Sequence, residues 1–480
     1  MTETSVYMGM RTRVALLALL LAAVLVTAQT AIPDTPAGQQ FSAWLTAFNS
    51  GDRGTLLAFL QKNHPERAGQ IDNEMGFRER TGGFEFKKTE ESTPTRFAAL
   101  VKERASDQFA RVVVEVDASE PHVIKALNLA PVPTPNEFAV PRLNQADALA
   151  ALRAEMAKQT AADHFSGAAI VVKDGKPVFS AAYGLADREK KTPNKLNTQF
   201  RIGSMNKMFT AVSVMQLVQA GKLKVSDTVG KILTDYPNQD VATKVTVHHL
   251  LTHTGGTGDI FTPEYEAHRL ELKTLQDYVK LYGKRGLEFE PGSRWEYSNY
   301  GFILLGAIVE KVSGQSYYDY VAEHLFKPAG MASTASLPED QLVPARSVGY
   351  TKAGGSSAWK PNTDTLPYRG TSAGGGYSTV EDLARFASAL ENHKLLDAEH
   401  TDLLTTGKVE TPRGDKYAYG LFDRTVGGVR CFGHGGGAPG MNGDLEICPQ
   451  SGYVMAALAN LDPPAAQRMT EFVAARLPAK

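Results

Sequence analysis

Ser204 and Lys207 stand three positions apart in the segment FRIGSMNK (residues 200–207), a spacing that can support nucleophilic catalysis. A serine hydroxyl is a weak nucleophile until a base takes its proton. The apolar run at residues 208–218 predicts a buried helix, and residues at i and i+3 of a helix share a face, so the amine can reach the hydroxyl. Burial at the helix start would lower the lysine pKa from about 10.4 toward about 7–8, and the helix dipole would favour negative charge near the serine.

Two further segments carry groups that proton transfer and oxyanion binding require. In the segment YSN (residues 297–299), Tyr297 and Asn299 project to the same side and offer a phenol and an amide that both donates and accepts. The segment FGHGGG (residues 432–437) ends a predicted strand. Its glycines would let a substrate lie against the strand edge, where a backbone N–H can bind an oxyanion.

With these three motifs, the chain resembles the serine β-lactamase and penicillin-binding-protein family. It is closest to the branch that contains class C β-lactamases, D-alanyl-D-alanine carboxypeptidases, D-aminopeptidases and related esterases. In that branch S-x-x-K is followed by Y-x-N and then by K-T-G or H-x-G. The resemblance covers most of residues 145–478 and includes five segments in the same order as in the family. They are FRIGSMNK, LLTHTGG (residues 250–256), residues 297–314, SAGGGYST (residues 372–379) with Asp382-Leu383, and the strand that ends at Asn460.

The resemblance implies a role for each motif residue. Ser204 would be the acylated nucleophile, and Lys207 and Tyr297 would share its deprotonation and the protonation of the leaving group. Asn299 would hold the substrate amide or the lysine. The backbone N–H groups of Ser204 and Gly437 would form the oxyanion hole.

In the third motif, His434 stands where many β-lactamases carry lysine. The resemblance implies that His434 binds a substrate carboxylate or polarises the tyrosine, and that Gly436 beside it contacts the substrate. A histidine that is neutral at most working pH values grips the carboxylate of a penicillin weakly. This departure favours a peptidase or an esterase over efficient β-lactam hydrolysis.

A proline-rich linker at residues 131–143 separates two predicted domains, because its prolines exclude helix and central strand. Before it, residues 36–130 show helical spacing and then four strand-like runs, which predicts a small α+β domain. That domain resembles the NTF2-like domains in pattern, and the sequence assigns it no chemistry. The fold class expected for residues 144–480 is α+β and β-lactamase/transpeptidase-like, an antiparallel sheet flanked by helices with a helical lobe. Its hairpin, residues 167–183, turns at Asp174-Gly175.

The first residues predict export. Arg11 and Arg13 precede an apolar run, residues 14–26, that is too short to span a membrane as a folded helix. Small residues at positions 26–28 match a signal-peptidase site, so residues 1–28 are expected to be a signal peptide and the mature chain periplasmic or secreted, with no stable membrane span. A retained anchor is the alternative.

The composition limits the classes of molecule that the protein is expected to bind. Lys plus Arg number 51 and Asp plus Glu number 52, for a net charge of −1, so nucleic-acid binding has no electrostatic support. The expected partner is a small-molecule or peptide substrate, with cell-wall fragments one such class; the oligomeric state stays open. Cys431 and Cys448 flank the third motif, and a disulfide and two buried thiols are both open. Asp444 and Glu446 are expected to be charges on the strand surface.

No cofactor or metal is expected. His249 and His253 have i, i+4 spacing, but no third ligand is evident, so a hydrogen-bonding role at a helix end is favoured over zinc binding. The triple glycines lack the lysine and the strand-to-helix setting of a phosphate loop. Three functions compete: an acyl-enzyme hydrolase acting on D-residue peptides, esters or β-lactam-like amides; a sensor of cell-wall fragments or penicillins that stays acylated; and a non-catalytic protein that binds through its first domain.

Overall fold

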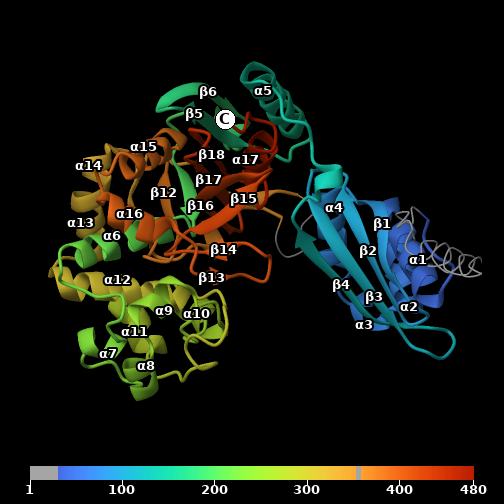
Figure 1. Cartoon of the computed structure of the whole chain (residues 1–480), viewed down its shortest axis with the longest axis horizontal. Helices are drawn as coiled ribbons and strands as arrows, with labels where there is room; N and C mark the ends of the chain where they lie inside the picture. Colours follow the sequence, from blue (N-terminus) through green and yellow to red (C-terminus); the bar gives the residue numbers. More distant parts are fainter. Residues whose placement is uncertain (1–30, 353–357) are drawn as a thin grey trace, which may run out of the picture. The chain divides into compact units, whose positions relative to one another are not determined.

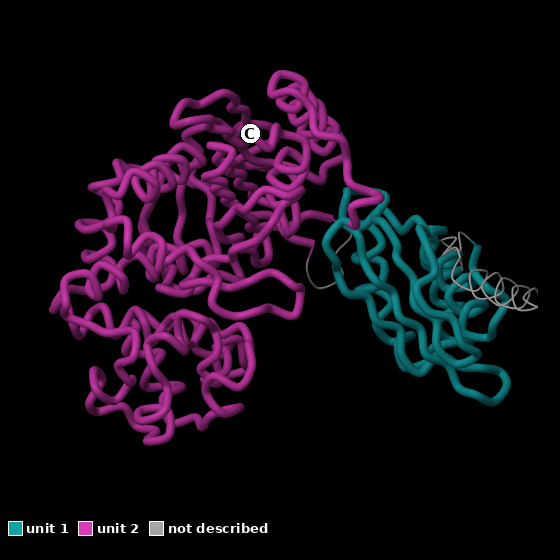
Figure 2. The backbone as a smooth tube through the Cα atoms, in the orientation of Figure 1, with its two compact units in different colours: residues 1–134 teal, residues 135–480 magenta. Residues whose placement is uncertain are grey.

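The computed structural model describes residues 31–352 and 358–480, and the chain forms two compact units, residues 1–134 and 135–480 (Figure 2). The predicted signal peptide, residues 1–28, lies outside the described residues. The division between the units falls inside the predicted linker, residues 131–143. No helix in the described part of the chain is long and apolar enough to cross a bilayer.

Unit 1 has helices followed by a four-stranded antiparallel sheet in the order β1-β2-β3-β4 (Figure 1). Its elements are α1 (Pro36–Ser50), α2 (Arg53–Asn63), α3 (Pro65–Ala68), α4 (Ile71–Thr81), β1 (Phe84–Ser92), β2 (Arg96–Glu103), β3 (Phe109–Val116) and β4 (Ile124–Val132). Phe41, Trp44 and Phe48 are buried along one face of α1, as their spacing predicts. Pro131 is accommodated because β4 is an edge strand. The likeness to NTF2-like domains stays a prediction.

Unit 2 is built on an eight-stranded sheet in the order β13-β14-β15-β16-β17-β18-β5-β6. Its strands are β5 (Gly167–Lys173), β6 (Lys176–Tyr183), β13 (Val409–Glu410), β14 (Lys416–Tyr417), β15 (Phe422–Val426), β16 (Val429–Ala438), β17 (Met441–Cys448) and β18 (Tyr453–Ala459). The predicted β5–β6 hairpin is confirmed, with Asp174 at φ 48° and Gly175 at φ 75° in its turn. Three strand pairs lie outside this sheet. They are β7 (Leu185–Asp187) with β8 (Thr192–Pro193), β9 (Phe200–Gly203) with β12 (Gly376–Ser378), and β10 (Tyr350–Thr351) with β11 (Lys360–Pro361).

Helices cover both faces of this sheet, which confirms the expected fold class (Figure 1). The two terminal helices, α5 and α17, pack on one face, and α6, α12 and α15 belong to the core on the other. The helices are α5 (Gln145–Ala161), α6 (Asn206–Gln219), α7 (Val229–Ile232), α8 (Gln239–Lys244), α9 (Val247–Leu251), α10 (Pro263–His268), α11 (Leu275–Tyr282), α12 (Asn299–Ser313), α13 (Tyr317–Val321), α14 (Lys327–Ala329), α15 (Val380–Glu391), α16 (Ala398–Thr405), α17 (Gln467–Ala474) and the short turns η1 (Asn136–Phe138), η2 (Ala322–Phe326) and η3 (Thr363–Thr365). In Figure 1 the helices from α7 to α12 gather in a yellow-green lobe apart from the sheet.

Asp444 and Glu446 are not surface charges, so that expectation was wrong. They lie on β17, a central strand whose two faces are both covered, and they are 1% and 2% exposed. Arg424 pairs with Glu446 at 3.2 Å, and the Thr470 hydroxyl donates to Asp444. Burial raises the pKa of Glu446 to about 8 although Arg424 acts in the opposite direction. The sequence pattern could not reveal this because the charges lie under helix α17.

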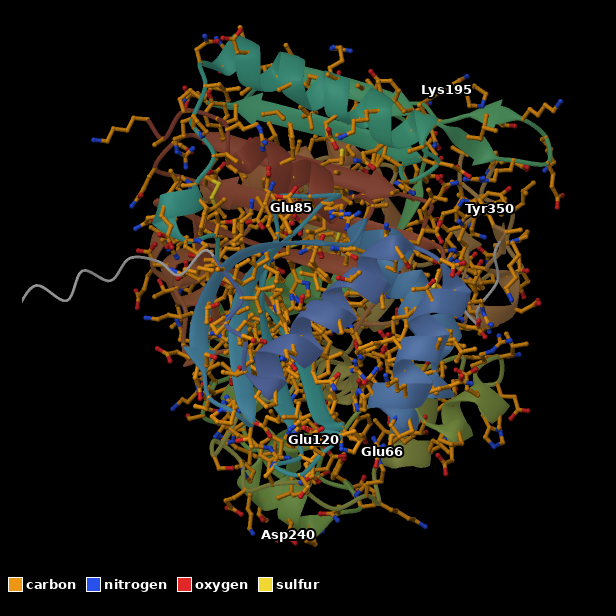
Figure 3. The ribbon with its side chains drawn as sticks, turned by 90° about the vertical axis from the view of Figure 1, so that its right-hand side faces the viewer. Glu66, Glu85, Glu120, Lys195, Asp240 and Tyr350 are labelled. Atoms are coloured by element: carbon orange, nitrogen blue, oxygen red, sulfur yellow. A yellow bond between two sulfur atoms is a disulfide. The ribbon has the colours of Figure 1, made fainter. Side chains whose placement is uncertain are left out.

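Exposed charges of both signs are found on each unit, in line with the near-zero net charge. Glu66, Glu85 and Glu120 of unit 1 and Lys195 and Asp240 of unit 2 are all exposed and are labelled in Figure 3.

Cys431 and Cys448 form a disulfide between the neighbouring strands β16 and β17, with their Cα atoms 4.1 Å apart. The bond closes a loop with a sequence separation of 17 residues. Replacing both cysteines by alanine should lower the free energy of unfolding by about 3 kcal/mol, since the unfolded chain regains the entropy of that loop. Urea unfolding of the variant and of the oxidised wild type measures this difference. Wild type treated with a reductant should lose a similar amount; equal stability of all three proteins would contradict the prediction.

Candidate active site

Ser204 lies in the turn between β9 and α6, where the backbone of this turn comes close to that of β16. Within residues 200–210 it is the one residue that keeps part of its surface exposed. Gly203 before it adopts φ 50°, a conformation that a side chain would strain. Lys207 is the second residue of α6, and its backbone N–H donates to the Ser204 carbonyl at 3.0 Å. This turn places both side chains on the same side of the helix start.

The Lys207 amine makes three contacts, and their chemistry defines its orientation. Nζ lies 2.7 Å from Asn299 Oδ1, 2.6 Å from the Ala373 carbonyl and 3.2 Å from Ser204 Oγ. A neutral amine has two N–H groups and one lone pair. The first two partners are carbonyl-type acceptors and take both N–H groups, so the lone pair faces the serine hydroxyl. This is the geometry that a base acting on Ser204 needs.

Asp259 fixes the orientation of Asn299. Both Asp259 carboxylate oxygens accept from Asn299 Nδ2, at 3.0 and 3.1 Å. An ionised carboxylate accepts and cannot donate, so the NH₂ end of the amide must face Asp259 and the oxygen must face Lys207. Asp259 belongs to none of the sequence motifs, and no signal in the sequence pointed to it.

Burial sets the protonation state of Lys207. Its side chain is fully buried and its contacts are to neutral groups, so desolvation lowers its pKa to about 7. The negative charge of Asp259 opposes this shift and raises the pKa. The direction of this shift is the one predicted from the sequence.

The pH dependence of acylation should report this pKa. If the neutral amine acts as the base, kcat/KM is expected to rise tenfold per pH unit below about pH 7 and to level off above it. Asp259→Asn removes the charge that raises the lysine pKa, so the rising limb should move to lower pH. Asp240→Asn, which alters an exposed carboxylate, should leave the limb unchanged. A limb unaffected by Asp259→Asn would argue against Lys207 as the titrating group.

Tyr297 contributes a neutral phenol. Desolvation raises its pKa above the ordinary value, and a hydrogen bond with Ser204 only partly offsets this shift. Lys207 Nζ lies 4.7 Å from the centre of the Tyr297 ring. The structure therefore places the Tyr297 ring beside the Lys207 amine and its hydroxyl near Ser204.

The glycines of the third motif allow β16 to lie against the Ser204 turn. A Cβ atom on Gly436 would lie 1.9 Å from the Ile202 carbonyl oxygen and 3.0 Å from the Ser204 nitrogen. A Cβ atom on Gly203 would lie 2.8 Å from the Gly437 nitrogen. Any side chain at these positions would force the backbones apart. The segments that carry the backbone N–H groups of Ser204 and Gly437, which are predicted to form the oxyanion hole, thus lie against each other.

His434 also lies on β16. The resemblance implied that its ring binds the substrate, but in the structure its ring nitrogens contact other groups of the protein. Its Nε2 lies 3.1 Å from Tyr417 Oη, and its Nδ1 is bonded to the Gly435 carbonyl. Both ring nitrogens are therefore engaged with the protein itself. Its ring centre lies 6.4 Å from that of Tyr297. His253, considered above as a metal ligand, also contacts Tyr417. Among the described residues, no three His, Cys, Asp or Glu side chains are grouped so that they could hold a metal ion.

Comparison with known proteins agrees with this geometry. The family model described as Beta-lactamase matches residues 151–480. Penicillin-binding protein 4 of Amycolatopsis lactamdurans is 30% identical over 62% of this chain and 81% of its own length. Two Bacillus subtilis (strain 168) relatives named as penicillin-binding proteins are 31% and 30% identical over 54% and 58% of this chain. The match spans 61% and 64% of their own lengths, less than two-thirds in each case.

Solved structures show the same similarity. The crystal structure of a penicillin-binding protein from Bacillus halodurans is 34% identical, with a TM-score of 0.60, over 65% of this chain and 97% of that one. A D-stereospecific amidohydrolase from Streptomyces sp. is 27% identical, with a TM-score of 0.56, over 67% of this chain and 97% of that one.

Proposed function

The chain belongs to the beta-lactamase family, and we propose that it is an exported serine hydrolase that forms an acyl-enzyme at Ser204. The observation that carries the proposal is the contact between the Lys207 amine and Ser204 Oγ, with both amine N–H groups directed to carbonyl acceptors. Export rests on the leader predicted at residues 1–28.

In the acylation step the Ser204 oxygen attacks the carbonyl carbon of the substrate while its proton passes to the Lys207 lone pair. The developing oxyanion accepts hydrogen bonds from the backbone N–H groups of Ser204 and Gly437. When the tetrahedral intermediate collapses, the bond to the leaving group breaks. Its nitrogen or oxygen takes a proton from Tyr297, which is replenished by the protonated Lys207.

Deacylation reverses these roles. A water molecule attacks the ester carbon, its proton passes through Tyr297 to Lys207, and Ser204 Oγ leaves and recovers a proton from Lys207. The partly exposed position of Ser204 gives water access to this ester. The same residues therefore serve as base and acid in turn, as a group with a pKa near 7 can at neutral pH.

The proposed substrates are small amides, esters or peptides that carry D-residues. This class is supported by similarity to the Streptomyces sp. D-stereospecific amidohydrolase and to penicillin-binding proteins, together with the absence of lysine at position 434. We place β-lactams lower, because their carboxylate meets a histidine whose ring nitrogens are already engaged.

A substrate panel tests this function. The purified protein is assayed with a nitrophenyl ester, a D-alanyl dipeptide and a chromogenic cephalosporin, and the acyl-enzyme is followed by mass spectrometry. We expect turnover of the ester and the D-residue substrate to exceed that of the cephalosporin. A stoichiometric burst without turnover would instead indicate a sensor that stays acylated, and no acylation by any substrate would overturn the proposal.

A further inference from the structure

A buried hydrogen-bond chain joins the second sequence motif to the third. It starts at the backbone N–H of Ser298 and passes through His253 and Tyr417 to His434. The distances are 3.1 Å from Ser298 N to His253 Nδ1, 3.1 Å from His253 Nε2 to Tyr417 Oη and 3.1 Å from Tyr417 Oη to His434 Nε2. The three side chains are at most 2% exposed.

The groups at the two ends of the chain determine the direction of every hydrogen bond. The Ser298 N–H can only donate, so His253 Nδ1 accepts and, in the neutral ring, Nε2 carries the hydrogen. That N–H donates to Tyr417 Oη, and the Tyr417 hydroxyl hydrogen then donates to His434 Nε2. His434 therefore carries its hydrogen on Nδ1, which donates to the Gly435 carbonyl, a group that can only accept.

The surroundings keep both histidines neutral. Burial and the charge of Lys207 lower the pKa of His253 and of His434, and Arg424 also lowers that of His434, which is about 3. The rings of Tyr297, Tyr417 and Phe422 pack around His434 at centroid distances of 5.2 to 6.4 Å. A positive charge on His434 would therefore be buried among aromatic rings and opposed by the charge of Arg424.

His253 also holds the backbone on both sides of Tyr297. Its carbonyl accepts from the Glu296 N–H at 2.9 Å, its Nδ1 accepts from the Ser298 N–H, and its ring lies 4.3 Å from the Tyr297 ring. His253 adopts φ 59°, a left-handed conformation that costs free energy for a residue other than glycine and that is concentrated at functional sites.

We propose that His253 and Tyr417 are positioning residues that keep both ring nitrogens of His434 hydrogen-bonded within the protein. The side of the site formed by His434 then offers the substrate neither a hydrogen-bond donor nor a positive charge. The site then takes substrates that are uncharged where they meet the third motif, such as an amide-terminated D-peptide or a neutral ester. The substrate class rests on the proposed acyl-enzyme function; the hydrogen-bond chain does not.

The hydrogen-bond chain can be tested in the wild-type protein, with one variant needed only to assign the signal. Nitrogen-15 NMR of its histidine rings, with His434 assigned by comparison with His434→Gln, should show a single tautomer with the hydrogen on Nδ1 from pH 5 to pH 9. A ring that protonates in this range, or that carries its hydrogen on Nε2, would overturn the proposal.

Tyr417→Phe and Tyr419→Phe form a matched pair. Each removes one hydroxyl from a buried tyrosine that is hydrogen-bonded to a histidine. Tyr419, however, is hydrogen-bonded to His248, which is not part of the hydrogen-bond chain. Tyr417→Phe should release the fixed tautomer of His434 and lower the acylation rate about tenfold with KM little changed, because His253, which supports Tyr297, loses the acceptor for its Nε2 hydrogen. Tyr419→Phe should leave both unchanged, even if stability falls equally. Equal effects of the two variants would mean that Tyr417 has only a structural role.

Two matched substrates test the specificity. D-alanyl-D-alanine amide and D-alanyl-D-alanine differ in the charge of their terminal group. We expect kcat/KM for the amide to exceed that for the acid at least tenfold. Preference for the acid would overturn the proposed specificity. If neither dipeptide is turned over while the ester is still hydrolysed, the peptide substrate class is wrong. If no substrate acylates the protein, the proposed function is wrong. In both cases the NMR result still tests the hydrogen-bond chain by itself.

Discussion

Ser204→Ala should abolish covalent labelling by a fluorophosphonate probe and all turnover of the nitrophenyl ester. The expected effect is complete because the variant lacks the oxygen that forms the ester bond, and a neighbouring group cannot replace it. Intact-protein mass spectrometry measures the labelling directly. The fold should persist, since Ser204 lies in a turn and keeps part of its surface exposed.

Ser213→Ala provides the control for this result. Ser213 lies on the same helix, is fully buried and donates to the Phe209 carbonyl at 2.8 Å. It carries the same chemical change away from the lysine amine, so labelling should continue at the wild-type stoichiometry. Labelled Ser204→Ala protein would show that another residue is the nucleophile.

Loss of the proton-transfer groups should have the next largest effect. Lys207→Met keeps the length of the buried side chain and removes the amine, and Tyr297→Phe removes the phenol oxygen. Each should slow acylation by about 10²–10⁴, the usual range for a positioned acid or base. Stopped-flow measurement of the burst with the ester gives this rate separately from deacylation.

The double variant shows whether the two groups act together. Because Lys207 and Tyr297 both handle the proton of Ser204, the loss in the double variant should fall well short of the product of the single losses. Lys280→Met, which replaces a lysine that is 80% exposed, should retain the wild-type rate. Losses that multiply would mean that the two groups act independently, contrary to the relay proposed above.

The sequence alone was sufficient wherever the information was local. The β5–β6 hairpin follows from two strand-like runs joined by the Asp174-Gly175 turn, and its predicted bounds are those of the structure. The contact of Lys207 with Ser204 follows from a spacing of three on a helix start. The family assignment also came from short motifs, because residues that must meet one substrate are constrained in type as well as in order.

The tertiary structure decided what depends on contacts between distant segments. Asp259 orients Asn299 from 40 positions away, and Tyr417 joins His253 across a separation of 164. Neither has a local pattern, because a single polar side chain in a loop or a short strand looks the same in sequence whether it is solvated or buried. Burial is a property of the assembled core: it lowers the pKa of Lys207 and of His434, and it encloses Asp444 and Glu446. The sequence thus determined the motif residues of the site, whereas packing added their partners and determined their protonation states and the directions of their hydrogen bonds.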